Sequence, residues 1–223
     1  MDKTLLRQAL LKLVSGFLLT ALLLFPAAGT WRCPGAWRLM GVLFVPMLVA
    51  GVVMLLKSPE LLRRRLNVRE QEPEQRRVIA LSGGMFALSF VLSGLDFRFQ
   101  WSKLPTGVSV GACVVFLAGY GLFAEVLREN VWLSRTVEVQ QGQKVIDTGL
   151  YGLVRHPMYA ATLLLFLSMP LILGSLPGLA VMLAYLPIIA RRIRNEEQVL
   201  LNGLEGYRDY CRRVKYRLIP FLW

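Results

Sequence analysis

The stretch of sequence that decides the fold is MYAATLLLFLSMPLILGSLPGLAVMLAYLPIIA, residues 158–190. This apolar block is too long for a single membrane span, because a helix of about 20 residues already crosses the hydrocarbon core of a bilayer. Pro170, Gly174 and Pro177 interrupt its centre, and residues of these types mark turns between helices. The block therefore predicts a helical hairpin with its tip at residues 173–177.

Four further apolar stretches lie upstream and approach or reach the length of a membrane span; they are residues 10–28, 39–56, 78–95 and 107–127. The first follows basic residues, as a signal core does, but its 19 residues exceed a typical signal core, so we expect a retained membrane helix. The sequence thus predicts an all-α, polytopic integral membrane protein. Region 1–127 holds four spans and a polar loop at 57–77, and region 128–223 holds a second loop, the hairpin and a tail helix.

The basic residues are distributed unevenly along the chain. If the spans alternate in direction, 22 of the 26 Lys and Arg residues fall on one side, in the N-terminal segment and in residues 57–77, 128–157 and 191–223. Cytoplasmic loops carry such an excess, so both termini are predicted to be cytoplasmic, in a bacterial inner membrane or an endomembrane. The net charge of +12 then reflects topology and attraction to anionic membrane lipids. No basic patch interleaved with aromatic residues predicts nucleic-acid binding.

The polar loop at 57–77 has two interpretations. Leu61, Leu62 and Leu66 fall at helical spacing, which favours a short amphipathic helix at the membrane interface. The alternative is a solvated loop whose arginines orient the protein in the membrane.

Glu125 lies near the end of the fourth span, three residues before Arg128. An acid within a membrane span is a functional candidate by default. An ion pair between Glu125 and Arg128 on neighbouring turns is the alternative, and the sequence leaves the role of Glu125 open.

The segment GLYGLVRHPMY, residues 149–159, contains His156, the single histidine of the chain. Proline suits the first position of a helix, so the first helix of the hairpin is predicted to begin at Pro157. A helix N-terminus attracts anions through its free N–H groups, and Arg155 adds positive charge beside it. The segment therefore predicts a site for a carboxylate or phosphate. The alternative is a basic helix start that anchors at lipid headgroups, with His156 as a cap.

A second polar motif, RRIRNEEQVLL at residues 191–201, follows the hairpin and lies at the same membrane depth. Arg192 and Glu196 share a helical face, as do Arg194 and Glu197. Of two adjacent carboxylates on different faces, one can accept hydrogen bonds from a ribose while the other braces an arginine. The alternative is a set of structural ion pairs, which add little stability.

These motifs follow one another in the order G-x-Y-x-x-V-R-H-P-x-Y, helical hairpin, R-x-x-x-E-E-x-x-L, Y-x-x-Y and R-L-I-P. In this order, residues 130–223 resemble the isoprenylcysteine carboxyl methyltransferase family, which is similar to phospholipid N-methyltransferases. The segment SPELLRRR at 58–65 resembles the loop that follows an early span in that family. One departure is Leu150, where many members have proline. The tail tyrosines Tyr207 and Tyr210 share a helical face, and we interpret them as mainly structural.

The resemblance implies an integral-membrane methyltransferase that transfers a methyl group from S-adenosylmethionine to a lipophilic small molecule or lipidated acceptor. The implied cofactor-binding residues are Gly149, Tyr151, Val154, Arg155, His156, Pro157, Tyr159, Glu196 and Glu197, and the implied catalytic residues are Arg192 and Glu196. A carboxylate acceptor such as isoprenylcysteine needs Arg192 to orient it but needs no base. Methyl transfer from a sulfonium is an in-line displacement that depends mainly on alignment and desolvation.

Three other functions remain open. A phospholipid amine acceptor would need a proton sink, for which Glu196, Glu197 and His156 are the available groups. A related membrane reductase would use NADPH, and a membrane scaffold or small transporter would bind no donor. A metal site is not predicted, because the chain has one histidine and three widely separated cysteines.

Overall fold

The computed structural model describes residues 3–66, 73–133 and 138–223, and the regular structure of these residues is helical, with no strand. In chain order the elements are α1 (Lys3–Ala28), α2 (Pro34–Lys57), α3 (Pro59–Leu66), α4 (Pro73–Phe99), α5 (Thr106–Glu129), the short 3-10 turn η1 (Gly149–Gly152), α6 (Pro157–Leu173), α7 (Leu176–Leu183), α8 (Tyr185–Gly203) and α9 (Tyr207–Arg213). Within the described residues, five helices are long and apolar enough to cross a membrane when α7 and α8 are taken together, and α6 is a shorter apolar helix. The predicted all-α, polytopic fold is confirmed.

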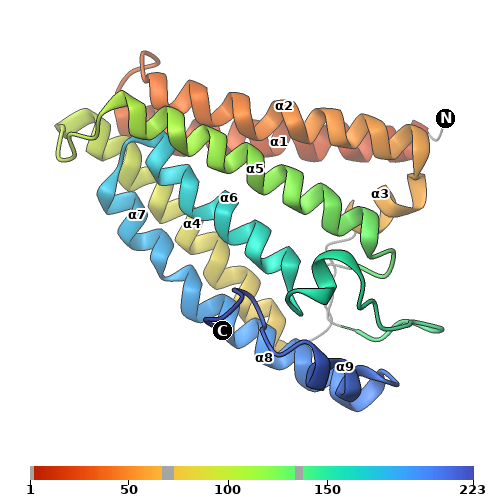
Figure 1. Cartoon of the computed structure of the whole chain (residues 1–223). Coiled ribbons are helices and arrows are strands. Elements are labelled where there is room, and N and C mark those ends of the chain that lie inside the picture. The colour runs from red at the N-terminus through yellow and green to blue at the C-terminus, as the bar shows by residue number, and fades with distance from the viewer. Residues whose placement is uncertain (1–2, 67–72, 134–137) are drawn as a thin grey trace.

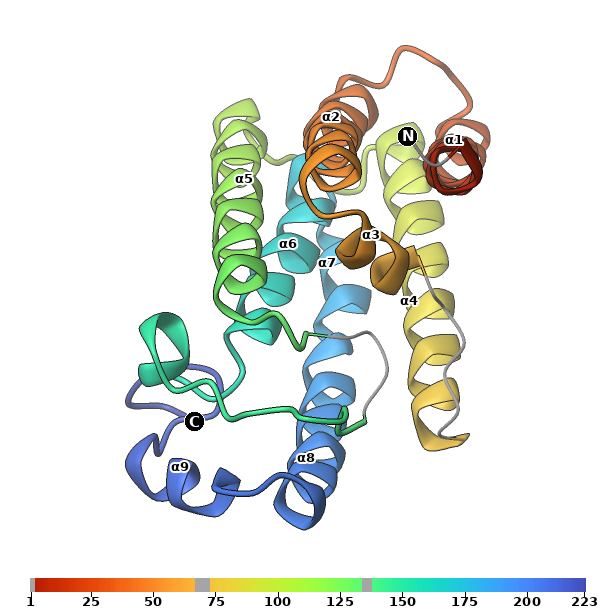
Figure 2. The same ribbon diagram turned by 90° about the vertical axis from the view of Figure 1, so that its right-hand side faces the viewer.

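The helices form a bundle in which α6 is central. It packs against α2, α4, α5 and α7, while α1 packs against α2 and α4 (Figures 1 and 2). The turns 29–33, 100–105 and 174–175 lie at one end of the bundle, which we call the turn end. The other end, which we call the loop end, holds the last turns of α2 and α5 and the first turns of α4 and α6. The chain after α5 and the C-terminal tail also gather there.

The hairpin forms where the apolar block is interrupted. Gly174 ends α6 with φ of 78°, a left-handed conformation that glycine adopts without steric cost. The Gly178 N–H then donates to Ser175 Oγ at 3.0 Å, which caps the start of α7. The tip therefore lies within residues 173–177, as predicted. The return leg continues as α8, which changes from apolar to polar and leaves the bundle at the loop end (Figure 1).

The structure decides between the alternatives left open for the 57–77 loop and for Glu125. Residues Pro59–Leu66 form the short helix α3, with Leu62 buried, so this part of the 57–77 loop is helical, and residues 67–72 lie outside the described structure. Glu125 accepts a hydrogen bond from Arg128 Nε at 2.8 Å, and both side chains are exposed. The ion pair expected as the alternative for Glu125 is therefore formed.

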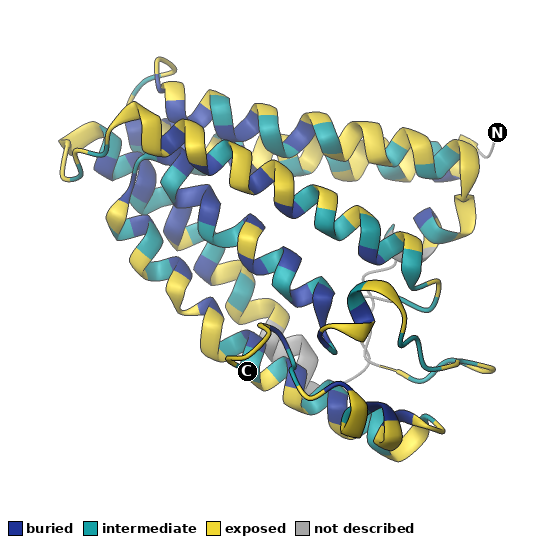
Figure 3. Cartoon of the chain, viewed as in Figure 1, coloured by how far each residue is buried: buried dark blue, intermediate teal, exposed yellow. Residues whose placement is uncertain are grey.

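Burial separates an inner core from an apolar outer surface (Figure 3). Leu39, Phe116 and Ile172 are fully buried where α2, α5 and α6 meet. In contrast, Leu22 of α1 and Val114 of α5 are 67% and 64% exposed. Apolar side chains exposed at this level on long helices suit the hydrocarbon interior of a membrane.

Candidate functional site

The Arg155-His156-Pro157 turn lies at the loop end and is held in place from α8. Glu197 Oε1 lies 3.1 Å from Arg155 Nη1 and 3.3 Å from His156 Nε2, and Arg217 Nε donates to Glu197 Oε2 at 2.8 Å. Glu197 is only 4% exposed, and a buried carboxylate is stable only when it is paired and hydrogen-bonded. Glu197 thus ties the turn, α8 and the tail into one unit.

The C-terminal tail also pairs with this turn through the backbone. The Arg155 N–H donates to the Tyr216 carbonyl at 2.9 Å, and the His156 N–H donates to the Arg217 carbonyl at 2.8 Å. At the start of α6, the Tyr159 N–H donates to the His156 carbonyl at 3.1 Å. The helix begins where the sequence predicts, but part of the backbone expected to attract an anion is already bonded within the protein.

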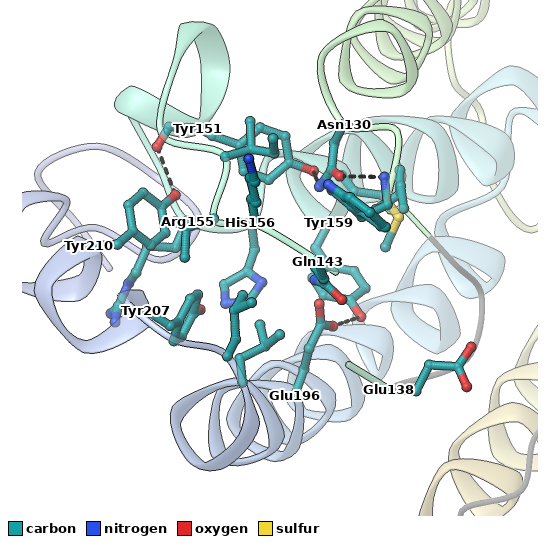
Figure 4. A pocket seen from close by; sticks show the side chains of 18 of the residues that line it. Asn130, Glu138, Gln143, Tyr151, Arg155, His156, Tyr159, Glu196, Tyr207 and Tyr210 are labelled. Carbon is teal, nitrogen blue, oxygen red and sulfur yellow. Dashed lines mark hydrogen bonds between the residues drawn. The ribbon is translucent and has the colours of Figure 1, made fainter. Parts of the chain in front are cut away.

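A cavity, which we call the polar cavity, opens beside the turn. Its walls come from the chain after α5, from the first turn of α6, from α8 and from the α9 region (Figure 4). Its polar lining residues are Asn130, Glu138, Gln143, Lys144, Tyr151, Arg155, His156, Tyr159, Arg192, Glu196, Tyr207 and Tyr210. Segments far apart in the sequence therefore meet around one space at the loop end.

Glu196 lies in the wall of the polar cavity and belongs to a second polar group. Tyr159 Oη donates a hydrogen bond to Glu196 Oε2 (Figure 4). Arg192 Nε donates to Tyr159 Oη at 2.9 Å. Tyr159 is buried. The two residues predicted to be catalytic are thus linked through Tyr159, which orients both side chains.

Two buried polar atoms of the cavity have no hydrogen-bond partner among the described residues: Arg155 Nε and Tyr207 Oη. Burial holds the pKa of Tyr207 well above its ordinary value, and the nearby Cys211 and Glu197 add to this effect. The phenol therefore stays protonated at neutral pH and can donate a hydrogen bond. Because buried polar groups normally have partners, these two atoms mark where the cavity can receive a polar or anionic ligand group.

Gly149 does not line the polar cavity but has a structural role at the end of α5. The carboxylate of Glu129, the last residue of α5, accepts a hydrogen bond from the Leu150 N–H at 2.9 Å. Gly149 has φ of +53°, and a Cβ at this position would lie 1.6 Å from Glu129 Oε1. Only glycine fits both the backbone angle and the close approach. Gly149 therefore anchors η1 to the end of α5.

The residues predicted from the sequence divide into two groups. Those that line the polar cavity are Tyr151, Arg155, His156, Tyr159, Arg192 and Glu196; those that are not among its lining residues are Gly149, Val154, Pro157 and Glu197. Glu197 was expected to share a helical face with Arg194, but its ion-pair partners are Arg155 and Arg217. Arg194 is exposed, whereas Glu197 is buried and receives its ion pairs from other elements.

Sequence reasoning missed cavity residues that belong to the chain after α5 and to α9. They are Asn130, Glu138, Gln143, Tyr207 and Tyr210. Tyr210 Oη donates to the Tyr151 carbonyl at 2.7 Å, and Asn130 Nδ2 donates to Tyr151 Oη at 2.9 Å, so two of them also hold the cavity wall. The shared face of the two α9 tyrosines was a usable signal. Asn130, Glu138 and Gln143 belong to no recognisable motif.

The chemistry of the polar cavity is that of binding and orienting a charged ligand. Its arginines and carboxylates are held in fixed geometry by their neighbours, which lowers the cost of positioning a bound group. Within the three described ranges, no group of three or more His, Cys, Asp or Glu side chains is arranged to hold a metal ion.

Comparison with known proteins shows that part of this chain resembles a known family. The phospholipid methyltransferase family model matches residues 108–204. This part of the chain is therefore similar to the phospholipid methyltransferase family. The isoprenylcysteine carboxyl methyltransferase-like membrane enzymes fall in the same family, so the resemblance drawn from residues 130–223 is confirmed at that level.

Curated relatives include two sterol reductases. The chain is 32% identical over 152 residues to the delta(14)-sterol reductase TM7SF2 of Mus musculus, covering 62% of this chain and 36% of that protein. It is 28% identical over 148 residues to the delta(14)-sterol reductase of Arabidopsis thaliana, covering 60% of this chain and 40% of that protein. It is also 28% identical over 132 residues to the cobalt-zinc-cadmium resistance protein CzcN of Cupriavidus metallidurans, covering 57% of each. The matched segment thus spans less than two thirds of each of these relatives.

The phospholipid methyltransferase region contains most of the polar cavity. It extends from α5 to the end of α8 and so includes the Arg155-His156-Pro157 turn and Glu196. The α9 tyrosines and Arg217, which complete the site, lie beyond the matched residues.

Proposed function

We propose that the protein is an integral-membrane methyltransferase that transfers a methyl group from S-adenosylmethionine to a lipophilic acceptor. The observation that carries the proposal is the polar cavity at the start of α6, where Arg155, His156 and Glu196 meet within the phospholipid methyltransferase region. S-adenosylmethionine supplies a methyl group on a positively charged sulfur and also carries a carboxylate, an amine and ribose hydroxyls. The lining of the cavity matches these groups in charge and hydrogen-bonding type.

The fit of the donor rests on three side chains. Arg155 Nε and Tyr207 Oη are buried donors without partners among the described residues, and a carboxylate placed there would receive charge-assisted hydrogen bonds. Glu196 suits the ribose, because carboxylate oxygens accept hydrogen bonds from adjacent hydroxyls. Glu197 has a separate role, since it keeps Arg155 in position.

The favoured acceptor group is a carboxylate such as that of isoprenylcysteine, oriented by Arg192. The acceptor oxygen forms the new bond to the methyl carbon as the sulfur–carbon bond breaks, and the electron pair of that bond stays on sulfur. No proton has to move, so alignment and exclusion of water provide most of the catalysis. The amine of a phospholipid is the close rival. It would release a proton, for which Glu196 and His156 are the candidate bases.

An apolar groove, which we call the acceptor groove, supports entry of the hydrocarbon chain from the bilayer. It lies between α2, α3 and α5, and its apolar lining residues include Pro46, Val49, Ala50, Val53, Met54, Leu61, Leu127 and Val131. Lys57 and Arg128 lie at its loop end, where they suit an anionic or zwitterionic headgroup. We place the loop end in the cytoplasm, because it carries the excess of basic residues. The soluble donor then arrives from the cytoplasm and the acceptor from the membrane.

The second candidate function is reduction of a lipophilic substrate with NADPH. The sterol reductases among the relatives favour it. Both functions place a soluble cofactor in the polar cavity and a lipid beside it, so the identity of the cofactor separates them.

Calorimetry on the purified protein in lipid nanodiscs tests the proposal. We expect wild-type protein to bind S-adenosylhomocysteine and the His156→Ala and Glu196→Ala variants to bind it weakly. Glu125→Gln is the matched control, because Glu125 is absent from the lining of the polar cavity and should leave affinity unchanged. Binding of NADPH without binding of S-adenosylhomocysteine would establish the reductase instead. Labelled donor incubated with membrane extracts would then identify the acceptor.

A further inference from the structure

Trp132 lies where the polar cavity and the acceptor groove meet. Of the described residues that line these two spaces, Trp132 is the one common to both. Its neighbours divide between them: Asn130 and Leu133 line the polar cavity, whereas Val131 lines the acceptor groove. The chain that follows α5 therefore forms a partition between the two spaces, with Trp132 at their junction.

The backbone of Trp132 is held on both sides by side chains. Its N–H donates to Asn130 Oδ1 at 3.0 Å, and its carbonyl accepts a hydrogen bond from Gln140 Nε2 at 2.6 Å. Asn130 Nδ2 also donates to Tyr151 Oη, and the Gln140 N–H donates to Gln143 Oε1, both at 2.9 Å. Because Tyr151 and Gln143 line the polar cavity, the partition is fastened to the cavity wall.

We infer that Trp132 is the positioning residue for methyl transfer: it closes the donor site against the bilayer and aligns the acceptor with the donor at the junction. The inference rests on the proposed function. The flat apolar body of an indole packs well against a hydrocarbon chain, and its face attracts a cation such as a sulfonium. Without the ring, the two spaces would join, and neither water exclusion nor in-line alignment would be maintained.

Difference fluorescence tests the position of Trp132. Wild type and Trp132→Phe are compared in nanodiscs with and without brominated phospholipid, and both are titrated with S-adenosylhomocysteine. The emission lost in the variant belongs to Trp132, and we expect brominated chains to quench it and S-adenosylhomocysteine to change it. Trp101→Phe is the matched control, because Trp101 is exposed at the turn end and its emission should not respond to S-adenosylhomocysteine. Failure of either response at Trp132 overturns the inference.

The Trp132→Leu variant tests the role of the ring, with Trp101→Leu as control. We expect its affinity for S-adenosylmethionine to fall about 2- to 30-fold, while its affinity for S-adenosylhomocysteine, whose thioether sulfur carries no charge, changes little. Methyl transfer from labelled donor to membrane extract should fall about tenfold or more. A parallel loss of affinity for both ligands would assign Trp132 a structural role and overturn the inference, as would an unchanged affinity ratio. Absence of S-adenosylhomocysteine binding by wild type would instead overturn the proposed function.

Discussion

Glu196 and Glu197 are adjacent in the sequence, yet one lines the polar cavity and the other is buried behind its wall. Adjacent residues on a helix point in different directions, so α8 presents one carboxylate to the cavity and the other to the Arg155-His156-Pro157 turn. The two carboxylates therefore differ in function, with Glu196 available to a ligand and Glu197 holding the site together.

Replacing Glu197 by Gln should destabilise the loop end of the protein. The change leaves Arg155, which is 10% exposed, without its anionic partner, and Arg217 loses the same partner. We expect the free energy of unfolding to fall by about 2–4 kcal/mol. This loss is smaller than the loss for a fully buried ion pair, because Arg217 is 35% exposed. Thermal unfolding in detergent would measure it, and a melting temperature equal to that of wild type would contradict the bracing role.

Replacing Glu196 by Gln should reduce ligand affinity with little change in stability. The amide keeps the shape of the side chain but loses the charge that strengthens its hydrogen bonds to ribose hydroxyls. A bond to a charged group contributes about 1.5–3 kcal/mol, so we expect S-adenosylhomocysteine to bind about 10- to 100-fold more weakly. Calorimetric titration of Glu196→Gln and Glu197→Gln with S-adenosylhomocysteine separates the ligand-binding role of Glu196 from the bracing role of Glu197. Unchanged affinity in Glu196→Gln would show that Glu196 is not part of the donor site.

Replacing Tyr207 by Phe should weaken ligand binding without loss of stability. The Tyr207 hydroxyl has no partner among the described residues, so its removal breaks no internal hydrogen bond, and affinity for S-adenosylhomocysteine should fall about 5- to 10-fold. Tyr210→Phe is the matched control, because it removes the bond to the Tyr151 carbonyl and should cost about 1 kcal/mol of stability. A destabilised Tyr207→Phe variant with normal affinity would be inconsistent with a ligand contact.

The same two tyrosines should make stability fall at alkaline pH. Burial raises the pKa of Tyr207 and of Tyr210 in the folded protein. Their stabilising contribution is therefore fully present below the unfolded-state pKa of about 10 and is lost as pH rises above it. Thermal unfolding between neutral and strongly alkaline pH should show a smaller decline in the Tyr207→Phe variant than in wild type, and an equal decline would count against the raised pKa.

Replacing Gly149 by Ala should disrupt the attachment of η1 to α5. The new Cβ would meet the Glu129 carboxylate, and the positive φ adds a backbone cost of about 1–2 kcal/mol. Gly142→Ala is the matched control, because Gly142 also has positive φ but no atom within 4 Å of the added Cβ. We expect the free energy of unfolding to fall only by this backbone cost in Gly142→Ala and by clearly more in Gly149→Ala. Equal losses in melting temperature would argue against the Glu129 contact.

Local physical chemistry explains how much of this protein could be predicted from its sequence. Long apolar runs predict membrane helices, and Pro170, Gly174 and Pro177 are residue types that mark turns, so the hairpin and its tip followed from the sequence. The start of α6 at Pro157 followed for the same reason, because proline lacks the N–H that a first helical turn leaves unused. The Arg192, Glu196 and His156 motifs were likewise recognisable as a group before their geometry was known.

The individual roles within the site depended on contacts between distant segments. Glu197 became a brace because the tail brings Arg217 back beside the turn, and Gly149 became an anchor because α5 ends next to it. Tyr207 and Trp132 belong to segments whose importance arises only from what packs around them. Patterns along the chain specify helices because their hydrogen bonds and apolar faces are local. The assignment of each side chain to a cavity, a groove or a buried ion pair requires the folded arrangement, because its partners come from other helices.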